Sequence, residues 1–202
     1  MRPFLAVLLT SLVLGTAPAA AASLSGMGQA IFGNSFNFSK ANLEKAPISA
    51  IQVGKLKVVL QSTRLKDVQK AFGGTLQQDG DGSGRADWLC YSAEGATVWF
   101  ISNALGGFEF VMMVAAEATS KPVKTCDPAP AGFTAPAFGV PGLGAATADL
   151  KSSFGAASGS KISYRADREG GYSNIAQYIG YLIKGGKVAG IGVGETSVPT
   201  PH

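Results

Sequence analysis

The loop from Asp79 to Asp87 has the spacing in this chain that comes nearest to a known chemistry. Its Asp, Ser and Gly residues fall at the first, third, fifth, sixth and ninth places of a calcium-binding loop. Oxygen ligands at alternate positions around a glycine bend suit a hard cation. The twelfth place, however, holds Cys90 instead of a bidentate glutamate, and Arg85 adds an opposing charge. A glycine-rich turn is therefore the favoured interpretation, with calcium binding as the alternative.

The sequence offers no positioned base for nucleophilic catalysis. Its only histidine is His202, the last residue, and a catalytic base or a zinc ligand has to be held by its surroundings. The 13 acidic residues are scattered. Glu109, Glu117 and Glu195 fall on strand edges, where a solvated charge is the ordinary interpretation. We therefore expect no enzyme activity, no metal site and no cofactor, and keep catalysis by carboxylates alone as a third hypothesis.

The two cysteines, Cys90 and Cys126, predict a disulfide bond. In an oxidising compartment such a pair is most simply joined. Closing the loop between them stabilises a fold by roughly 3–4 kcal/mol in the chain-entropy model. A redox or metal pair is the alternative, but the spacing is not C-x-x-C and no histidine lies nearby.

The first 22 residues have the features of a signal peptide. Arg2 supplies the positive start, an apolar run extends from Phe4 to Leu14, and the small residues up to Ala22 offer a cleavage site. We place the cleavage after Ala22. No later stretch approaches the about 20 apolar residues that a membrane span needs. The sequence therefore predicts a periplasmic or secreted protein with no membrane span after signal removal.

The net charge of the chain is only mildly positive, with 17 basic and 13 acidic residues. The basic residues form no cluster with interleaved aromatic rings, which disfavours nucleic acid as a partner. The 27 glycines, together with many Ala, Ser and Val residues, are typical of a β-rich exported protein rather than of a disordered one.

Two segments of the chain share one pattern of helix, strand, strand, strand, over residues 62–118 and 144–196. In the helices, Asp67 and Phe72 of the first segment match Asp149 and Phe154 of the second, and a glycine follows each phenylalanine. Each aspartate is interpreted as a first-turn charge that favours the helix N-terminus. Tandem copies of so small a unit usually share one core, because a single copy buries too little apolar surface.

The expected strands can be paired between the two segments, and every length difference falls in a Gly-rich or polar stretch. Loops absorb insertions whereas packed elements do not. We therefore predict an α+β protein in which two tandem αβββ repeats, each a helix with an antiparallel sheet, form one two-part domain. The predicted division is 1–22 signal peptide, 23–61 N-terminal lead-in, 62–120 repeat 1, 121–143 Pro-rich connector, 144–196 repeat 2, and 197–202 frayed tail. The pattern leaves open whether residues 23–46 dock on the core.

The order of these elements resembles a known family of exported modules. The helix Thr63–Gly73, the strand Trp88–Tyr91 and the strand pair around Gly106 and Gly107 resemble the BamE/SmpA outer-membrane assembly lipoproteins. The tandem arrangement is similar to the β-lactamase inhibitory protein architecture, in which two such units form one concave sheet surface. The chain lacks the lipid-attachment cysteine of the former and has no cysteine in its second copy. The resemblance implies protein binding without catalysis.

Two patterns indicate where binding could occur. Gly190, Gly192 and Gly194 lie on one face of a strand, where a helix, the opposite repeat or a flat ring could approach closely; packing inside the protein is the favoured interpretation. Trp and Tyr dominate binding hot spots because they bury much area at low entropic cost. The candidate binding surface comprises Trp88, Tyr164, Tyr172, Tyr178 and Tyr181.

The sequence thus favours a non-enzymatic protein-interaction module of the bacterial envelope. It would bind an envelope or extracellular protein of unknown identity through its sheet and through the loops around residues 79–87 and 165–175. The alternative is a protein that binds a small ligand or a cell-wall glycan in a Tyr-rich cleft between the two copies.

Overall fold

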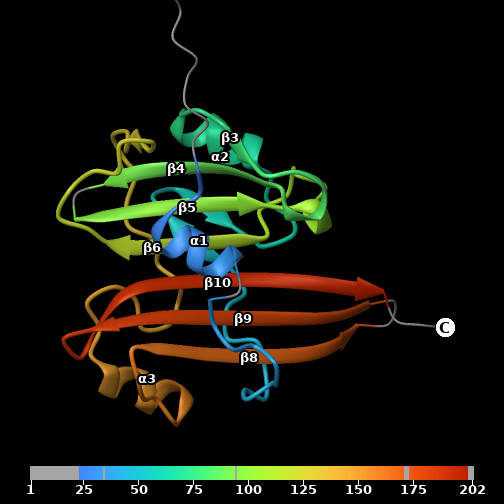
Figure 1. The fold of residues 1–202 in the computed structure, drawn as a ribbon, viewed down its shortest axis with the longest axis vertical. Coiled ribbons are helices and arrows are strands. Elements are labelled where there is room, and N and C mark those ends of the chain that lie inside the picture. The colour runs from blue at the N-terminus through green and yellow to red at the C-terminus, as the bar shows by residue number, and fades with distance from the viewer. Residues whose placement is uncertain (1–22, 34, 94, 171–172, 200–202) are drawn as a thin grey trace, which may run out of the picture.

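The computed structural model describes residues 23–33, 35–93, 95–170 and 173–199 (Figure 1). Its centre is an antiparallel sheet in the strand order β3-β4-β5-β6-β10-β9-β8, and a short strand, β7, pairs in parallel with β4. The strands are β3 (Gln77–Asp79), β4 (Ala86–Ala93), β5 (Ala96–Ser102), β6 (Met113–Ala118), β7 (Asp127–Pro128), β8 (Lys161–Gly170), β9 (Ser173–Lys184) and β10 (Lys187–Pro199). Three α-helices accompany this sheet within the described ranges, so the predicted α+β class is confirmed.

The predicted signal peptide, residues 1–22, lies outside the described residues. None of the helices in the described part of the chain combines the length and the apolar composition that crossing a bilayer requires.

Side chains of the protein itself cover both faces of the sheet. On β5, Val98 and Phe100 belong to one apolar core, whereas Trp99 and Ile101 belong to another. Successive residues of a strand point to opposite faces, so a continuous apolar run such as 98–101 indicates a strand that is buried on both sides. The sheet therefore separates two cores.

The first core lies between the sheet and two helices. Val68 and Leu150, one from each helix, are fully buried in it. The two helices cover opposite ends of the sheet, one near β4 and the other near β8 (Figure 1). A short antiparallel hairpin joins this layer. The elements are α2 (Leu65–Phe72), α3 (Thr147–Phe154), β1 (Ile51–Val53) and β2 (Leu56–Val58).

The second core lies beneath α1 (Gly26–Phe32), which packs across β6 and β10 (Figure 1). The sequence left open whether the lead-in docks, and the structure shows that it does. Met27 and Ile31 of α1 are buried, as is Phe36 after it. The lead-in is therefore part of the fold.

The glycine face of β10 explains how α1 comes so close to the sheet. A Cβ atom built at Gly192 would lie 2.9 Å from Ile31 Cβ and 2.9 Å from Met27 Cε, and one at Gly190 would lie 3.1 Å from Met27 Sδ. Larger residues at these positions would hold the helix away. The expected packing of this face inside the protein is confirmed, and α1 is the helix that it receives.

Two boundaries differ from the prediction. Within the first predicted repeat, α2 is followed by four strands rather than three, because Gln77–Asp79 adds the short strand β3 beside the start of β4. The last strand, β10, continues to Pro199, where it pairs with Ser173 of β9. Ladder pairing therefore extends past residue 197, where the frayed tail was expected to begin; residues 200–202 lie outside the described residues.

Cys90 and Cys126 form the predicted disulfide, with their Cα atoms 4.9 Å apart. The bond attaches the Pro-rich connector to β4, and the adjacent residues 127 and 128 continue this attachment as β7. The connector thus returns to the sheet beside β4.

Candidate functional site

The structure corrects the predicted aromatic surface. Trp88, Tyr164 and Tyr181 are 1%, 3% and 0% exposed, so their rings belong to the cores and are closed to a partner. Tyr178 is half-buried and packs on Phe38, with the two ring centroids 5.0 Å apart. Tyr172 lies outside the described residues. The expectation of exposure failed because elements cover both faces of the sheet, which leaves no solvent side for strand aromatics.

The face of the sheet that carries the first core becomes polar at one end. Residues of like parity on a strand share a face, and the apolar positions of β8, β9 and β10 continue into polar ones with that period. Register sets Glu195 opposite Gln177, and sets Ser197 and Arg168 on either side of Ile175. Three neighbouring strands therefore bring one carboxylate, one amide, one hydroxyl and one guanidinium group to a common surface.

Glu195 is the centre of this polar group. Its side chain is 10% exposed. Its Oε1 accepts hydrogen bonds from Gln61 Nε2 at 2.8 Å and from Arg168 NH2 at 3.4 Å, and its Oε2 accepts one from Gln177 Nε2 at 3.2 Å. Burial, and secondly the nearby Glu195 carboxylate, raise the pKa of Tyr178 on the other face of the sheet. The expectation that Glu195 is a solvated charge is therefore wrong.

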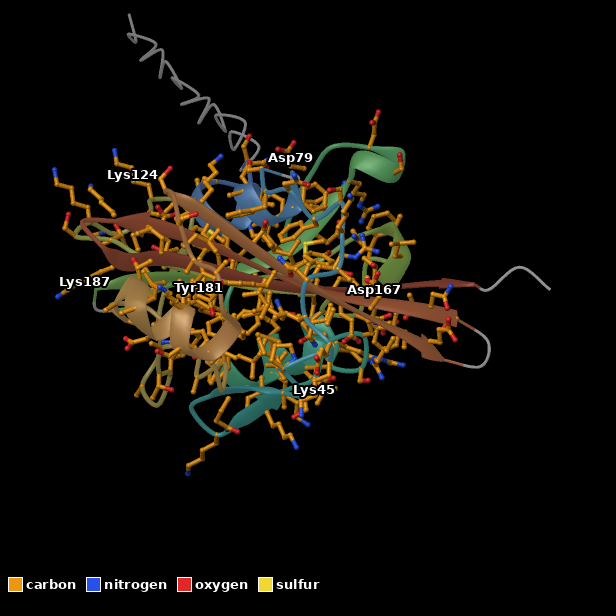
Figure 2. The ribbon with its side chains drawn as sticks, turned by 90° about the horizontal axis from the view of Figure 1, so that it is seen from below. Lys45, Asp79, Lys124, Asp167, Tyr181 and Lys187 are labelled. Carbon is orange, nitrogen blue, oxygen red and sulfur yellow. A yellow bond between two sulfur atoms is a disulfide. The ribbon has the colours of Figure 1, made fainter. Side chains whose placement is uncertain are left out.

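A cleft of about 640 Å³ opens over these residues. Its floor includes Gln177, Glu195 and Ser197, and its walls come from the chain segments 44–51 and 58–62. Figure 2 labels Lys45 and Asp167, which line the cleft from the lead-in and from β8, respectively. We call this space the Glu195 cleft. Clefts of this volume with a few convergent polar groups are the usual form of a small-molecule site.

No aromatic side chain lines the Glu195 cleft in the part of the chain that the structure describes. The alternative prediction placed a Tyr-rich cleft between the two copies, and this cleft has a different lining. Charged, amide and hydroxyl groups mix with aliphatic residues such as Ile48 and Leu60. A ligand would therefore be recognised by charge and hydrogen bonds, because no ring is present to stack on.

Gln61 is held in a strained conformation at the wall of the cleft. Its φ angle is 61°, in the left-handed region, which costs a non-glycine residue on the order of 1–2 kcal/mol. Its backbone N–H donates to Val111 O at 2.9 Å, its amide donates to Glu195, and Ser197 Oγ donates to its Oε1 at 2.7 Å. Backbone strain of this kind gathers at functional sites. Gln61 thereby connects the wall to the floor.

The glycine-rich loop at 79–87 has its last carboxylate engaged already. Asp87 is 5% exposed, and Arg85 donates to both of its oxygens at 2.7 Å. A calcium ion would have to displace this guanidinium. The described residues also contain no group of three or more His, Cys, Asp or Glu side chains arranged to hold a metal ion. This geometry favours the glycine-rich turn over calcium binding.

A second exposed surface is formed by two short 3-10 helices, η1 (Gly82–Gly84) and η2 (Ala104–Gly106), which lie against each other. Leu105 at the tip of η2 is 62% exposed, the most of any large apolar residue in the described ranges. Beside it, the guanidinium of Arg85 lies 4.3 Å from the centroid of the Phe108 ring. Leu105, Phe108 and Arg85 therefore form a small apolar and cationic patch, to which the 79–87 loop contributes Arg85.

Two other glutamates differ in role from Glu195. Glu117 accepts a hydrogen bond from the Met27 N–H at 2.7 Å and so caps the N-terminus of α1, whereas Glu109 forms exposed ion pairs with Arg64 and Lys66. Sequence reasoning missed Glu195, Gln177 and Arg168 as a group. The available signal was the alternation along each strand, because each of these residues lies at the same alternate positions as the buried apolar residues of its strand.

Comparisons of the chain with protein-family models, with curated proteins and with solved structures gave no match.

Proposed function

We propose that this chain is an exported, non-enzymatic binding protein of the bacterial envelope, and that it binds a small polar ligand in the Glu195 cleft. The observation that carries this proposal is the cleft itself, which opens over the almost fully buried carboxylate of Glu195 and its hydrogen-bonded neighbours. The disulfide suits an oxidising compartment, and the apolar run of residues 4–14 suits export. Because most of the predicted aromatic residues are buried, binding through exposed aromatic rings is less well supported.

The floor of the cleft is well suited to hold a ligand in one orientation. Gln177 donates to Ile48 O at 2.7 Å and accepts from Ile48 N at 3.0 Å, which ties the floor to the lead-in wall. Glu195 and Gln61 are held in turn by hydrogen bonds to their neighbours. Groups that are fixed before binding lose little entropy when a ligand arrives.

A thermal-shift panel tests the proposal on the chain without residues 1–22. Amino acids, sugars, dicarboxylates and amines are screened, and at least one class should raise the melting temperature, because a ligand that binds only the folded state stabilises it. Ser49→Trp places an indole in the wall and should abolish the shift. Ser153→Trp, on the exposed side of α3, should keep it. A panel without any stabiliser, or a shift that survives Ser49→Trp, would refute the proposal.

The second candidate function is the binding of an envelope or extracellular protein through the loop around 79–87 and the neighbouring strand ends. The loop that the sequence predicted around 165–175 is not one in the structure, because residues 165–170 belong to β8 and residues 173–175 to β9. The exposed Leu105 and the stacked Arg85 and Phe108 favour it, since a small apolar and cationic patch is a common interface centre. Capture of a defined partner from envelope extract should then be lost with Leu105→Asp and retained with Ser49→Trp. The reverse result would assign partner binding to the cleft.

We also propose that the two helix-and-sheet stretches are tandem copies, in keeping with the resemblance to BamE/SmpA-like modules. Four local contacts support this. Asp67 accepts from Arg64 N at 3.1 Å and Asp149 from Ala146 N at 2.9 Å. The hydroxyl of Tyr91 donates to Gly73 O at 2.7 Å, and that of Tyr164 donates to Ala156 O at 3.0 Å. In both stretches, a tyrosine hydroxyl from a following strand therefore donates a hydrogen bond to a carbonyl oxygen just after the C-terminal end of the helix.

A further inference from the structure

We propose that the ligand of the Glu195 cleft is a small zwitterion, a molecule that carries a primary ammonium group and a carboxylate, as a free amino acid or a short peptide does. This inference rests on the proposed function, because it names the ligand class of the same site. It follows from three features of the cleft. These are the remaining hydrogen-bond acceptor capacity of Glu195, the remaining donors of Arg168 and the presence of charges of both signs in the lining.

Glu195 can receive an ammonium group. A carboxylate oxygen accepts about two hydrogen bonds, and within the described residues Oε2 accepts a single one, from Gln177 at 3.2 Å. The only cationic group in contact with Glu195 there is Arg168, at 3.4 Å from Oε1, which is longer than a strong charge-assisted contact. A buried carboxylate requires compensation by opposite charge, so an ammonium group at Oε2 would be well placed.

Arg168 can receive a carboxylate. Its guanidinium has five N–H donors, and one of its nitrogens, NH2, donates to Glu195. The described residues provide it with no other hydrogen bond, and its side chain is 56% exposed while it lines the cleft. The planar fork matches a carboxylate with two parallel hydrogen bonds. The contact with Glu195 restrains the guanidinium beside the ammonium site.

The charges that line the cleft select against ligands of a single sign. The cleft is lined by three acidic and two basic residues, namely Glu44, Asp167, Glu195, Lys45 and Arg168. In a ligand that reaches both Glu195 and Arg168, a diamine would set its second ammonium group against Arg168, and a dicarboxylate would set its second carboxylate against Glu195. Like-charge neighbours disfavour binding in both cases. A molecule with one charge of each sign matches the lining best.

Calorimetric titration tests this inference with derivatives that lack one charge. L-Alanine and the dipeptide Ala-Ala represent the two sources of the zwitterion, and at least one of them should bind. For that parent, the methyl ester lacks the carboxylate and the N-acetyl form lacks the ammonium group. Each should bind at least about tenfold more weakly, as expected when one charged hydrogen-bonding partner is lost. Equal affinity of parent and derivatives would overturn the inference.

Two variants connect each charge of the ligand to its residue. Arg168→Met should weaken binding of the parent about tenfold or more and remove its preference over the methyl ester. Glu195→Gln, which keeps the shape of the side chain, should remove the preference over the N-acetyl form. Glu109→Gln, at an exposed position away from the cleft, is the matched control and should change neither. If Glu195→Gln fails to fold, the Arg168→Met result decides alone.

The outcomes separate this inference from the function on which it rests. If a sugar, an amine or a dicarboxylate stabilises the protein and Ser49→Trp blocks the effect while zwitterions do nothing, the cleft is a ligand site and the zwitterion assignment is wrong. If no molecule in either panel binds, both proposals fail together.

Discussion

Gly28 of α1 lies directly against the indole of Trp99 in β5. A Cβ built at residue 28 would be 2.9 Å from Trp99 Cγ and 3.1 Å from both Cδ1 and Cδ2. The ring is 2% exposed, so it is enclosed by neighbours that resist its displacement. The absence of a side chain at Gly28 thus sets the distance between the helix and the sheet.

Gly28→Ala should therefore destabilise the protein, although alanine is the better helix former. Overpacking typically costs 1–3 kcal/mol and the helix preference returns about 1 kcal/mol, so we expect a net loss of roughly 1 kcal/mol, measured by urea unfolding. Gly142→Ala is the control, because no atom lies within 4 Å of a Cβ there and its φ angle is outside the left-handed region. A Gly28→Ala protein as stable as the parent would contradict this packing.

Removal of the disulfide should lower the free energy of unfolding by about 3–4 kcal/mol, the loop-closure value for cysteines 36 residues apart. The double variant Cys90→Ala, Cys126→Ala is compared with the parent in urea. A reducing agent should destabilise the parent by a similar amount and leave the variant unchanged. Sensitivity of the variant to the reducing agent would point to another cause.

Tyr91 and Tyr181 should respond oppositely to removal of the hydroxyl. Tyr91 donates a hydrogen bond to Gly73 O at 2.7 Å, whereas the buried hydroxyl of Tyr181 has no partner among the described residues. Tyr91→Phe should cost about 1 kcal/mol, and Tyr181→Phe should be neutral or stabilising at neutral pH, because an unsatisfied polar group is removed. Unfolding curves of the two variants, measured side by side, provide the test; a larger loss for Tyr181→Phe would be inconsistent with it.

Stability should fall in alkaline solution. Burial, and secondly the neighbouring Tyr164, raise the pKa of Tyr181 above its ordinary value. An unfolded tyrosine loses its proton near pH 10, so above that pH the unfolded chain binds fewer protons than the folded one. The free energy of unfolding then drops by about 1.4 kcal/mol per pH unit for each such tyrosine. Tyr181→Phe should flatten this slope between pH 10 and 11 by about one tyrosine's share, and an unchanged slope would refute the assignment.

The two helix-capping aspartates should contribute equally. Asp67→Ala and Asp149→Ala each remove the carboxylate that accepts the N–H at the helix start, and each should cost about 0.5–2 kcal/mol. Asp81→Ala, in the exposed loop, is the control. Losses that differ greatly between the two helices would weaken the proposal that the stretches are tandem copies.

The sequence was sufficient to predict α2, α3 and the central strands, because their signals are local, but it did not predict α1. The Phe-Gly endings at Phe72 and Phe154 lie at the C-terminal ends of α2 and α3, and the apolar run Val98–Ile101 lies within β5. The disulfide followed from the presence of two cysteines together with the expected export to an oxidising compartment. Capping by Asp67 and Asp149 was likewise predictable, since a first-turn carboxylate next to a free backbone N–H is a short-range arrangement.

The candidate site was not predictable in the same way, because it depends on long-range pairing. Gln61 reaches Glu195 across 134 residues of sequence, and no periodic signal marks such a contact. The burial of Trp88 and Tyr181 depends on α1 and on the helices of the other layer, and the sequence left open whether residues 23–46 dock on the core. The contacts of the candidate site and the burial of these aromatic residues were unpredictable for the same reason, because tertiary packing decides which elements cover a sheet.

The first core and the Glu195 cleft share the alternation of the same three strands. One inserted residue within β9 or β10 would move the residues on one side of the insertion to the opposite face of the sheet, unless a local irregularity absorbed it as one does between Val188 and Gly190. Substitution of Arg168, Gln177 or Glu195 would therefore change which ligand the cleft binds and keep the strand pairing. A change in the length of these strands would disturb the first core and the cleft together. Insertions are tolerated better at the turns that join the strands.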